Sequence, residues 1–170
     1  MASALIVYAS LTGNTEEIAD IVADQLEALG VDVEVKECTQ VAPEDFLEYD
    51  MNIIATYTYG TDGDLPDEFM DFYEEMEDVD FTGKIAGVVG SGDTFYEYYC
   101  KAVDDFEEQF KKFGATIGAE NVKIDLNAEE EDIAIGSRGP CQHLANNRII
   151  QKLGDRRLNP LDTLANVIDL

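Results

Sequence analysis

Short apolar runs alternate along the chain with stretches in which apolar residues recur at helical spacing. The apolar runs are long enough for buried strands and lie at 4–9, 31–35, 51–55, 85–89 and 122–126. The helical stripes lie between them, at 18–29, 69–76 and 103–113. Parallel strands are buried on both faces and are joined by helices, so this pattern is typical of a parallel sheet covered on both sides. It predicts an α/β fold, a three-layer α/β/α sandwich with a five-stranded parallel sheet and right-handed crossovers.

The balance of charge narrows the range of functions. The 170 residues include 11 Lys and Arg against 37 Asp and Glu, a net charge of -26, yet 45% of the chain is hydrophobic. A chain this apolar can bury a core, so the acidic residues belong to a folded domain and not to a disordered tail. Such a surface repels nucleic acids and anionic lipid headgroups and favours basic protein partners. We therefore expect a protein that binds neither nucleic acid nor membranes.

No segment suggests export, membrane insertion or a metal site. The apolar runs are far below the roughly 20 residues that a membrane helix needs, and the amino terminus has no signal-peptide pattern. Cys38, Cys100 and Cys141 are too few for a disulfide framework and have no C-x-x-C spacing. His143 is the one histidine, so a Ser-His-Asp or Cys-His site would have to use it. We expect a cytoplasmic protein.

The loop after the first apolar run, Ser10-Leu11-Thr12-Gly13-Asn14-Thr15, leads directly into a helix. Its hydroxyl and amide groups and its backbone N–H groups can cradle a phosphate at the helix amino terminus. The loop has neither the lysine of a Walker loop nor the three glycines of a dinucleotide fingerprint. Neutral donors and the helix dipole suit one terminal monophosphate without Mg²⁺. The alternative is a hydroxyl-rich helix cap.

Two further loops, after the third and fourth apolar runs, are rich in tyrosine and glycine. The first reads T-Y-T-Y-G-T-D-G-D-L-P from Thr56, and the second reads G-S-G-D-T-F-Y-E-Y-Y-C from Gly90. An aromatic ring beside a glycine can stack on a flat ligand while the backbone approaches it closely. The alternatives are an ordinary Gly-Asp turn with an exposed tyrosine and packing of aromatic side chains underneath the loop, and we expect this packing for Phe95, Tyr98 and Tyr99.

Together the loops suit a planar heterocycle between two aromatic rings with a phosphate tail, which is the shape of FMN. The motifs S-x-T-G-N-T, T-Y-T-Y-G with L-P-D-E-F after it, and G-S-G-D-x-x-Y-E-Y-Y-C resemble those of short-chain bacterial flavodoxins. The resemblance covers residues 1 to about 133. It implies the strand order 2-1-3-4-5, for which flavodoxin is itself a standard example.

The resemblance also implies a role for individual residues. The loop at 10–15 and Thr58 would hold the phosphate, with Tyr59 on the inner face of the ring and Tyr96 on the outer face. Gly60 matches the glycine whose carbonyl turns toward N5 of the flavin. Asp93 and the backbone of Ser91 and Gly92 would meet the pyrimidine edge, and Cys100 matches a cysteine near it. The full set of expected cofactor-binding residues is Ser10, Leu11, Thr12, Gly13, Asn14, Thr15, Thr58, Tyr59, Gly60, Thr61, Ser91, Gly92, Asp93, Tyr96 and Cys100.

The implied function is a low-potential one-electron carrier with non-covalent FMN, which exchanges electrons with basic redox proteins and is not an enzyme. One alternative is an FMN-dependent reductase or quinone oxidoreductase, but no extra segment offers a nicotinamide or substrate site. The other is a non-redox receiver or interaction module of the same topology. Ser10, Leu11 and Thr12 stand where a receiver needs clustered acidic residues, and Thr56-Tyr57 where it needs its phosphoacceptor Asp.

The tail departs from the resemblance. Residues 1–133 hold 6 basic and 34 acidic residues, net -28, whereas residues 134–170 hold 5 and 3, net +2. G-S-R-G-P at 136–140 breaks regular structure where the family has an acidic amphipathic last helix. An altered reading frame or an artificial ending is the favoured explanation, ahead of a natural extension or a partner-binding helix. We expect a monomer, in which 144–153 or 160–169 could cover the sheet, within the molecule or by exchange with a neighbour.

Overall fold

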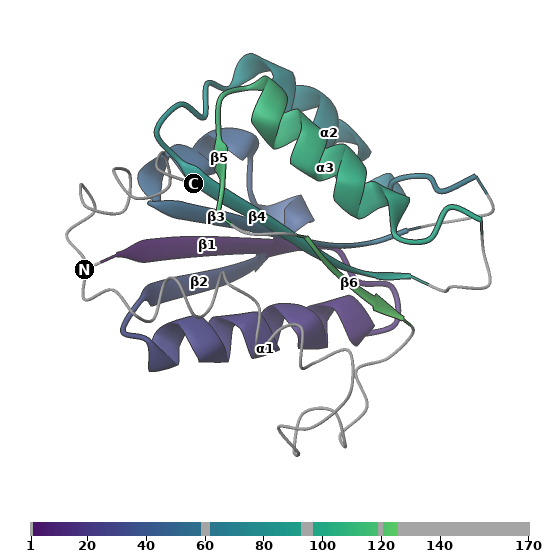
Figure 1. Ribbon diagram of the computed structural model, residues 1–170, viewed down its shortest axis with the longest axis horizontal. Coiled ribbons are helices and arrows are strands. Elements are labelled where there is room, and N and C mark those ends of the chain that lie inside the picture. Colours follow the sequence, from purple (N-terminus) through teal and green to yellow (C-terminus); the bar gives the residue numbers. More distant parts are fainter. Residues whose placement is uncertain (1, 59–61, 93–96, 119–120, 126–170) are drawn as a thin grey trace.

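The computed structural model describes residues 2–58, 62–92, 97–118 and 121–125, where helices and strands alternate as predicted (Figure 1). The strands are β1 (Ser3–Tyr8), β2 (Asp32–Glu37), β3 (Met51–Tyr57), β4 (Ile85–Gly92), β5 (Thr116–Ile117) and β6 (Val122–Asp125). The α-helices of these ranges are α1 (Asn14–Ala28), α2 (Met70–Glu75) and α3 (Lys101–Lys112). Short 3₁₀ helices are η1 (Cys38–Gln40), η2 (Pro43–Glu48), η3 (Asp67–Phe69) and η4 (Met76–Asp78).

The strands form one parallel sheet in the order β2-β1-β3-β4, with β5 and β6 both beyond β4. β5 pairs with the start of β4, where Ile85 is opposite Thr116. β6 pairs with its end, where Ser91 is opposite Ile124. The two are pieces of one interrupted fifth strand, which confirms the five-stranded order 2-1-3-4-5. This strand begins earlier than the predicted range 122–126.

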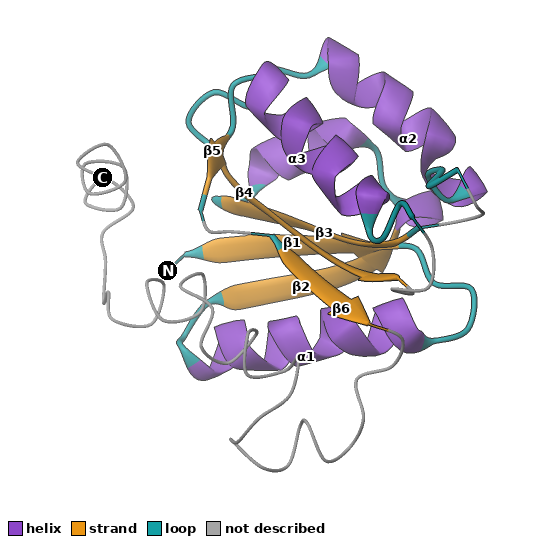
Figure 2. Cartoon of the chain, turned by 45° about the vertical axis from the view of Figure 1, so that its right-hand side comes forward, coloured by secondary structure: helices purple, strands orange, loops and turns teal. Residues whose placement is uncertain are grey.

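Helices cover both faces of the sheet, with α1 on one side and α2 and α3 on the other (Figures 1 and 2). Along β1 the side chains alternate, so that Ala4 and Ile6 join the core under α1 while Leu5 and Val7 join the core under α2 and α3. This period of two is the geometry of a strand buried on both faces. The predicted three-layer sandwich is therefore confirmed for the described residues.

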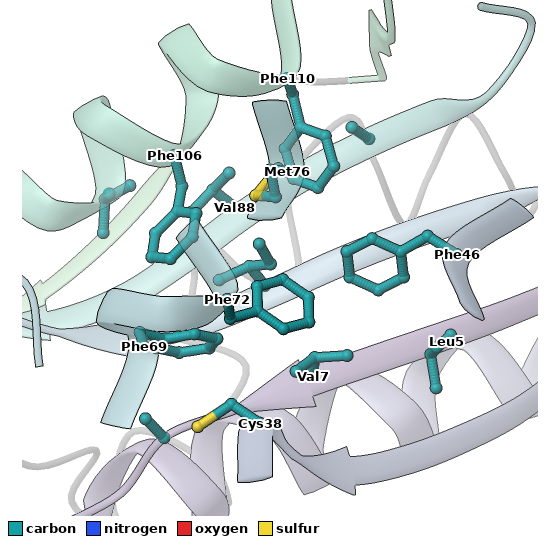
Figure 3. Close-up of a cluster of buried hydrophobic side chains, with 14 of the residues drawn as sticks. Leu5, Val7, Cys38, Phe46, Phe69, Phe72, Met76, Val88, Phe106 and Phe110 are labelled. Carbon is teal, nitrogen blue, oxygen red and sulfur yellow. The ribbon is translucent and has the colours of Figure 1, made fainter. Parts of the chain in front are cut away.

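The core under α2 and α3 is aromatic (Figure 3). Phe69 and Phe106 meet edge to face with ring centroids 4.9 Å apart, and Phe46 meets Phe72 in the same way at 5.7 Å. Such pairs add to the hydrophobic effect of burial. The stripe predicted at 69–76 packs here, but it is α-helical only over α2, with η3 and η4 at its two ends.

The close approach of α3 to the sheet depends on Gly90. A Cβ atom at this position would lie 2.4 Å from the carbonyl oxygen of Thr56 and 2.4 Å from Cγ2 of Val103. A side chain here would therefore have to push α3 away from β4. The glycine brings the start of α3 next to the carboxyl ends of β3 and β4, where the predicted site lies.

Candidate cofactor-binding site

Three loops meet at the carboxyl ends of β1, β3 and β4: the first loop (9–13), the second loop (58–66) and the third loop (93–100). In parallel sheets this edge is where ligands bind. Among the described residues, hydrogen bonds link Thr15 and Thr58 to Ser91 at this edge, and Gly63 of the second loop lies against Tyr98 of the third loop.

The first loop ends at Gly13, which has φ of +93° and caps the amino end of α1. Nothing would contact a Cβ atom there, so the left-handed backbone and not lack of space favours glycine. The Gly13 N–H donates to Oγ of Ser10 at 3.0 Å, and the Gly13 carbonyl accepts from the Glu17 N–H at 2.9 Å. Leu11 and Thr12 are exposed. The loop thus presents hydroxyls beside the first N–H groups of a 15-residue helix, without a cation.

Thr15 joins the first loop region to the end of β4. Its side chain is 2% exposed, and its Oγ1 lies 3.1 Å from Oγ of Ser91, where either atom can donate. Ser91 is 7% exposed and is held by β3 on one side and β6 on the other. Two hydroxyls from residues 76 positions apart are therefore buried together at the sheet edge.

Thr58 joins the second loop to both β4 and α3. Its N–H donates to the Ser91 carbonyl at 3.3 Å, and its Oγ1 accepts a 3.3 Å hydrogen bond from the Ala102 N–H. The second contact caps the first turn of α3 from outside the helix. The family resemblance implies a phosphate contact for Thr58. Its hydroxyl oxygen is engaged with α3 here, although a hydroxyl that accepts still has its own proton to donate.

The described end of the third loop packs tightly against β4. Cys100 has φ of +51°, and it is the one residue other than glycine with a left-handed backbone in the ranges that the structure covers. A Cβ atom at Gly92 would lie 2.8 Å from its Sγ, so glycine is needed for this approach. Cys100 is fully buried, and burial raises the pKa of its thiol to about 11. The thiol is therefore protonated and inert at neutral pH.

The second and third loops also touch at Gly63 and Tyr98. A Cβ atom at Gly63, which has φ of +74°, would lie 2.5 Å from Cβ of Tyr98. Tyr99 is half-buried against the aromatic core, as its predicted packing requires. Tyr98 is 44% exposed, so the prediction that its ring packs underneath the loop is wrong. Its Cβ atom lies against the second loop, at Gly63.

The remaining predicted ring contacts lie outside the described residues. These are Tyr59, Gly60, Thr61, Asp93 and Tyr96, together with Phe95, whose packing was predicted. The tail at 134–170, with Cys141 and His143, also lies outside them. The two stacking positions stay predictions.

Sequence reasoning missed the residues that anchor the second loop at its base. The Tyr57 phenol donates to Oε2 of Glu68 at 3.0 Å, and the Cys38 thiol donates to the Glu68 carbonyl at 3.3 Å. Burial and the Glu68 carboxylate raise the pKa of Tyr57 above its usual value. One signal in the sequence could have pointed to them. A tyrosine stands at the last position of an apolar strand, and the hydroxyl group of a tyrosine that is partly buried usually needs a hydrogen-bond partner.

The arrangement fits FMN better than a metal or a triphosphate. A left-handed glycine, a serine hydroxyl and a helix amino terminus come together here, and their neutral donors suit a phosphate group without a cation. Among the described residues, no three His, Cys, Asp or Glu side chains gather as metal ligands. Within the same ranges, no helix is long and apolar enough to cross a membrane.

Comparison with known proteins shows the family. The flavodoxin family model matches residues 6–136. The chain is 46% identical over 133 residues to "Probable flavodoxin 2" of Bacillus subtilis, which covers 78% of this chain and 87% of the relative. The solved flavodoxin of Streptococcus pneumoniae TIGR4 is 59% identical, with a TM-score of 0.76 over 89% of this chain and 95% of its own.

A solved mutant flavodoxin of Fusobacterium nucleatum, K13G, is bound to flavin mononucleotide. It is 24% identical and has a TM-score of 0.60, over 91% of this chain and 92% of its own, so its likeness concerns the fold. Residues 137–170 extend beyond the range of the family model. The chain belongs to the flavodoxin family, as a short-chain bacterial flavodoxin, an electron-transfer protein that uses bound FMN.

Proposed function

We propose that FMN binds where the three loops meet, with its phosphate at the amino terminus of α1 and its ring between the second and third loops. The observation that carries this placement is the position of Ser91, which contacts Thr15 through its hydroxyl and Thr58 through its carbonyl. It ties the predicted phosphate loop to both predicted ring loops. The proposed contacts are those of Ser10, Leu11, Thr12, Gly13, Asn14, Thr15, Thr58, Tyr59, Gly60, Thr61, Ser91, Gly92, Asp93, Tyr96 and Cys100.

The phosphate would be held without a cation. Hydroxyls of Ser10, Thr12 and Thr15 and the N–H groups of the first turn of α1 donate to it, and the helix dipole favours its charge. Glu16 and Glu17 also lie in this first turn. Since their charges oppose a second anion, the selectivity for a phosphate would come from directed donors and not from net charge.

One-electron chemistry is a property of the FMN itself. The chain controls how easily negative charge accumulates there. A carboxylate 10 Å away through water opposes an added electron by only ~0.4 kcal/mol, but the effects of many carboxylates add up. The segment 1–133 has a net charge of -28. We therefore assign a low potential, with the second electron harder to add than in free FMN.

The redox partners would present basic surfaces, because the acidic body attracts and orients them. The same charge disfavours nucleic acids and anionic membranes. We place the protein in the cytoplasm. Residues 1–133 would form the FMN-binding domain, and 134–170 a tail that replaces or covers for the last helix usual in the family.

The phosphate assignment is tested by comparing FMN with riboflavin, which lacks the phosphate. The apoprotein is titrated with each flavin, and binding is followed by quenching of flavin fluorescence. We expect FMN to bind far more tightly, and Thr12→Ala to weaken FMN while riboflavin is unaffected. Equal affinities for the two flavins would contradict the assignment. An absorption spectrum with a dithionite titration then checks that the bound flavin is redox active.

A further inference from the structure

Thr15 and Ser91 bring two buried hydroxyl groups into contact beside the proposed phosphate site. Their hydroxyl oxygens lie 3.1 Å apart, and Thr15 is 2% exposed and Ser91 7% exposed. Thr15 lies in the first turn of α1, at the proposed phosphate site, whereas Ser91 is the last residue but one of β4. The sequence analysis assigned to Ser91 only a backbone contact at the pyrimidine edge of the ring.

Each hydroxyl has one proton and two lone pairs. Only one of the two protons can occupy the shared hydrogen bond. If Thr15 donates to Ser91, Thr15 has no proton left for a phosphate oxygen. If Ser91 donates to Thr15, the Thr15 proton is free to point at the phosphate. A phosphate accepts and does not donate when fully ionised, so its presence selects the second arrangement.

We propose that Ser91 is a positioning residue for the phosphate, whose hydroxyl donates to Oγ1 of Thr15 and so directs the Thr15 proton at the FMN phosphate. The inference rests on the proposed function, because it requires the phosphate to lie at the start of α1. It gives the Ser91 side chain a role at the phosphate end of the ligand.

The backbone of Ser91 is well suited to hold a donor in place. Its neighbours in the sheet are Tyr57 on β3 and Ile124 on β6. Its carbonyl accepts from the Thr58 N–H at 3.3 Å. Because the strands fix the backbone and burial excludes water, the Ser91 hydroxyl has little freedom left to lose when the ligand binds. A hydrogen bond to a charged group is stronger than one between neutral groups, so the orientation of Thr15 affects affinity.

A double-mutant cycle of Ser91→Ala and Thr15→Val tests the proposal, with dissociation constants for both FMN and riboflavin. We expect Ser91→Ala to weaken FMN by about three- to tenfold and riboflavin by less than about twofold. In the Thr15→Val background, Ser91→Ala should have no further effect on FMN. Chemical unfolding of each apoprotein, together with riboflavin binding, shows that the variants fold and retain the ring site.

Thr56→Val is the matched control, since Thr56 is a fully buried strand threonine whose hydroxyl donates to the Tyr57 carbonyl at 3.1 Å. It should leave the ratio of the two flavin affinities unchanged. The proposal fails while the phosphate placement stands in two cases. In the first, Thr15→Val weakens FMN binding only, but Ser91→Ala weakens the binding of both flavins equally. In the second, the effects of Thr15→Val and Ser91→Ala on FMN binding add in the double mutant. If Thr15→Val itself weakens both flavins equally, the phosphate placement is wrong and the proposal fails with it.

Discussion

The Tyr57 phenol donates to the Glu68 carboxylate across the two ends of the second loop, at 3.0 Å. Glu68 is held a second time, because its carbonyl accepts from the Cys38 thiol at 3.3 Å. Cys38 follows β2 and Tyr57 ends β3, so two strand ends fix the start of η3. Between these anchors lies the loop that carries the predicted flavin contacts.

Tyr57→Phe removes the first of these anchors. Because a half-exposed hydrogen bond to a carboxylate contributes roughly 0.5–1.5 kcal/mol, we expect FMN and riboflavin to bind about two- to tenfold more weakly. Both flavins are affected because this loop is predicted to contact the ring. Tyr49→Phe is the control, since Tyr49 also bonds a carboxylate, that of Glu34, but precedes β3 at the opposite edge of the sheet. Unchanged flavin affinity in Tyr57→Phe would contradict the anchor role.

Electron transfer to a basic partner should fall steeply as salt is added. The net charge of -28 over 1–133 attracts a cationic protein, and ions screen this attraction with a Debye length of about 10 Å at 0.1 M. The measurement is the stopped-flow rate of reduction of cytochrome c, a basic acceptor, between low and high ionic strength. Ferricyanide, a small anion, is the control, and its rate should rise. A rate with cytochrome c that does not depend on salt would rule out electrostatic docking.

Replacing Asn52 by valine should stabilise the protein. Asn52 is fully buried in β3, between Leu5 and Ala86, and neither amide atom has a hydrogen-bond partner within the described structure. A buried polar group without a partner costs about 1–3 kcal/mol, and valine suits a strand. We expect the free energy of unfolding, measured with urea, to be about 1–2 kcal/mol higher for Asn52→Val than for the unaltered protein. The affinity for FMN should be unchanged. Lower stability would mean that the amide has a partner.

Alkaline pH should destabilise the fold through its buried thiols. Burial raises the pKa of Cys100 from 9.0 to about 11 and that of Cys38 to about 12. Between the unfolded and folded pKa values the unfolded chain loses its thiol proton first, so the unfolding free energy falls as pH rises. The loss per thiol is at most about 1.4 kcal/mol per pH unit. In urea unfolding measured at several pH values, the unfolding free energy of Cys100→Ala should fall less steeply between pH 9 and 11 than that of the unaltered protein. An unchanged slope would contradict burial of this thiol.

Truncation after Ile133 tests the domain boundary. Every proposed cofactor-binding residue precedes this point, so the shortened protein should bind one FMN with unchanged affinity. Among the described helices, only α1 covers its face of the sheet, and we expect the loss of the tail to lower the stability of that face. The measurements are FMN stoichiometry and urea unfolding. A shortened protein that no longer binds FMN would place part of the site in the tail.

Local pattern was enough to predict the layers and the loops. Apolar alternation and helical spacing depend on neighbouring residues, so they located β1, β3 and β4 and the loops that follow them. Prediction was weaker where pairing determines structure. The piece of the fifth strand at Thr116–Ile117 is two residues long, and it exists because it lies beside Ile85 and Ala86. Tyr98 was misplaced because the exposure of a loop side chain depends on contacts between loops, and its Cβ atom lies against Gly63 of the second loop.

The sequence by itself determined the α/β/α layers, the acidic body that ends near residue 133, and the loop chemistry that fits a phosphate and a flat ring. These properties depend on local periodicity and composition. Only the tertiary structure decided which side chains meet, such as Thr15 with Ser91, 76 positions away, and Thr58 with Ala102, 44 positions away. The register of parallel strands and the distance of a helix from the sheet fix such pairs, and neither is encoded in the spacing of neighbouring residues.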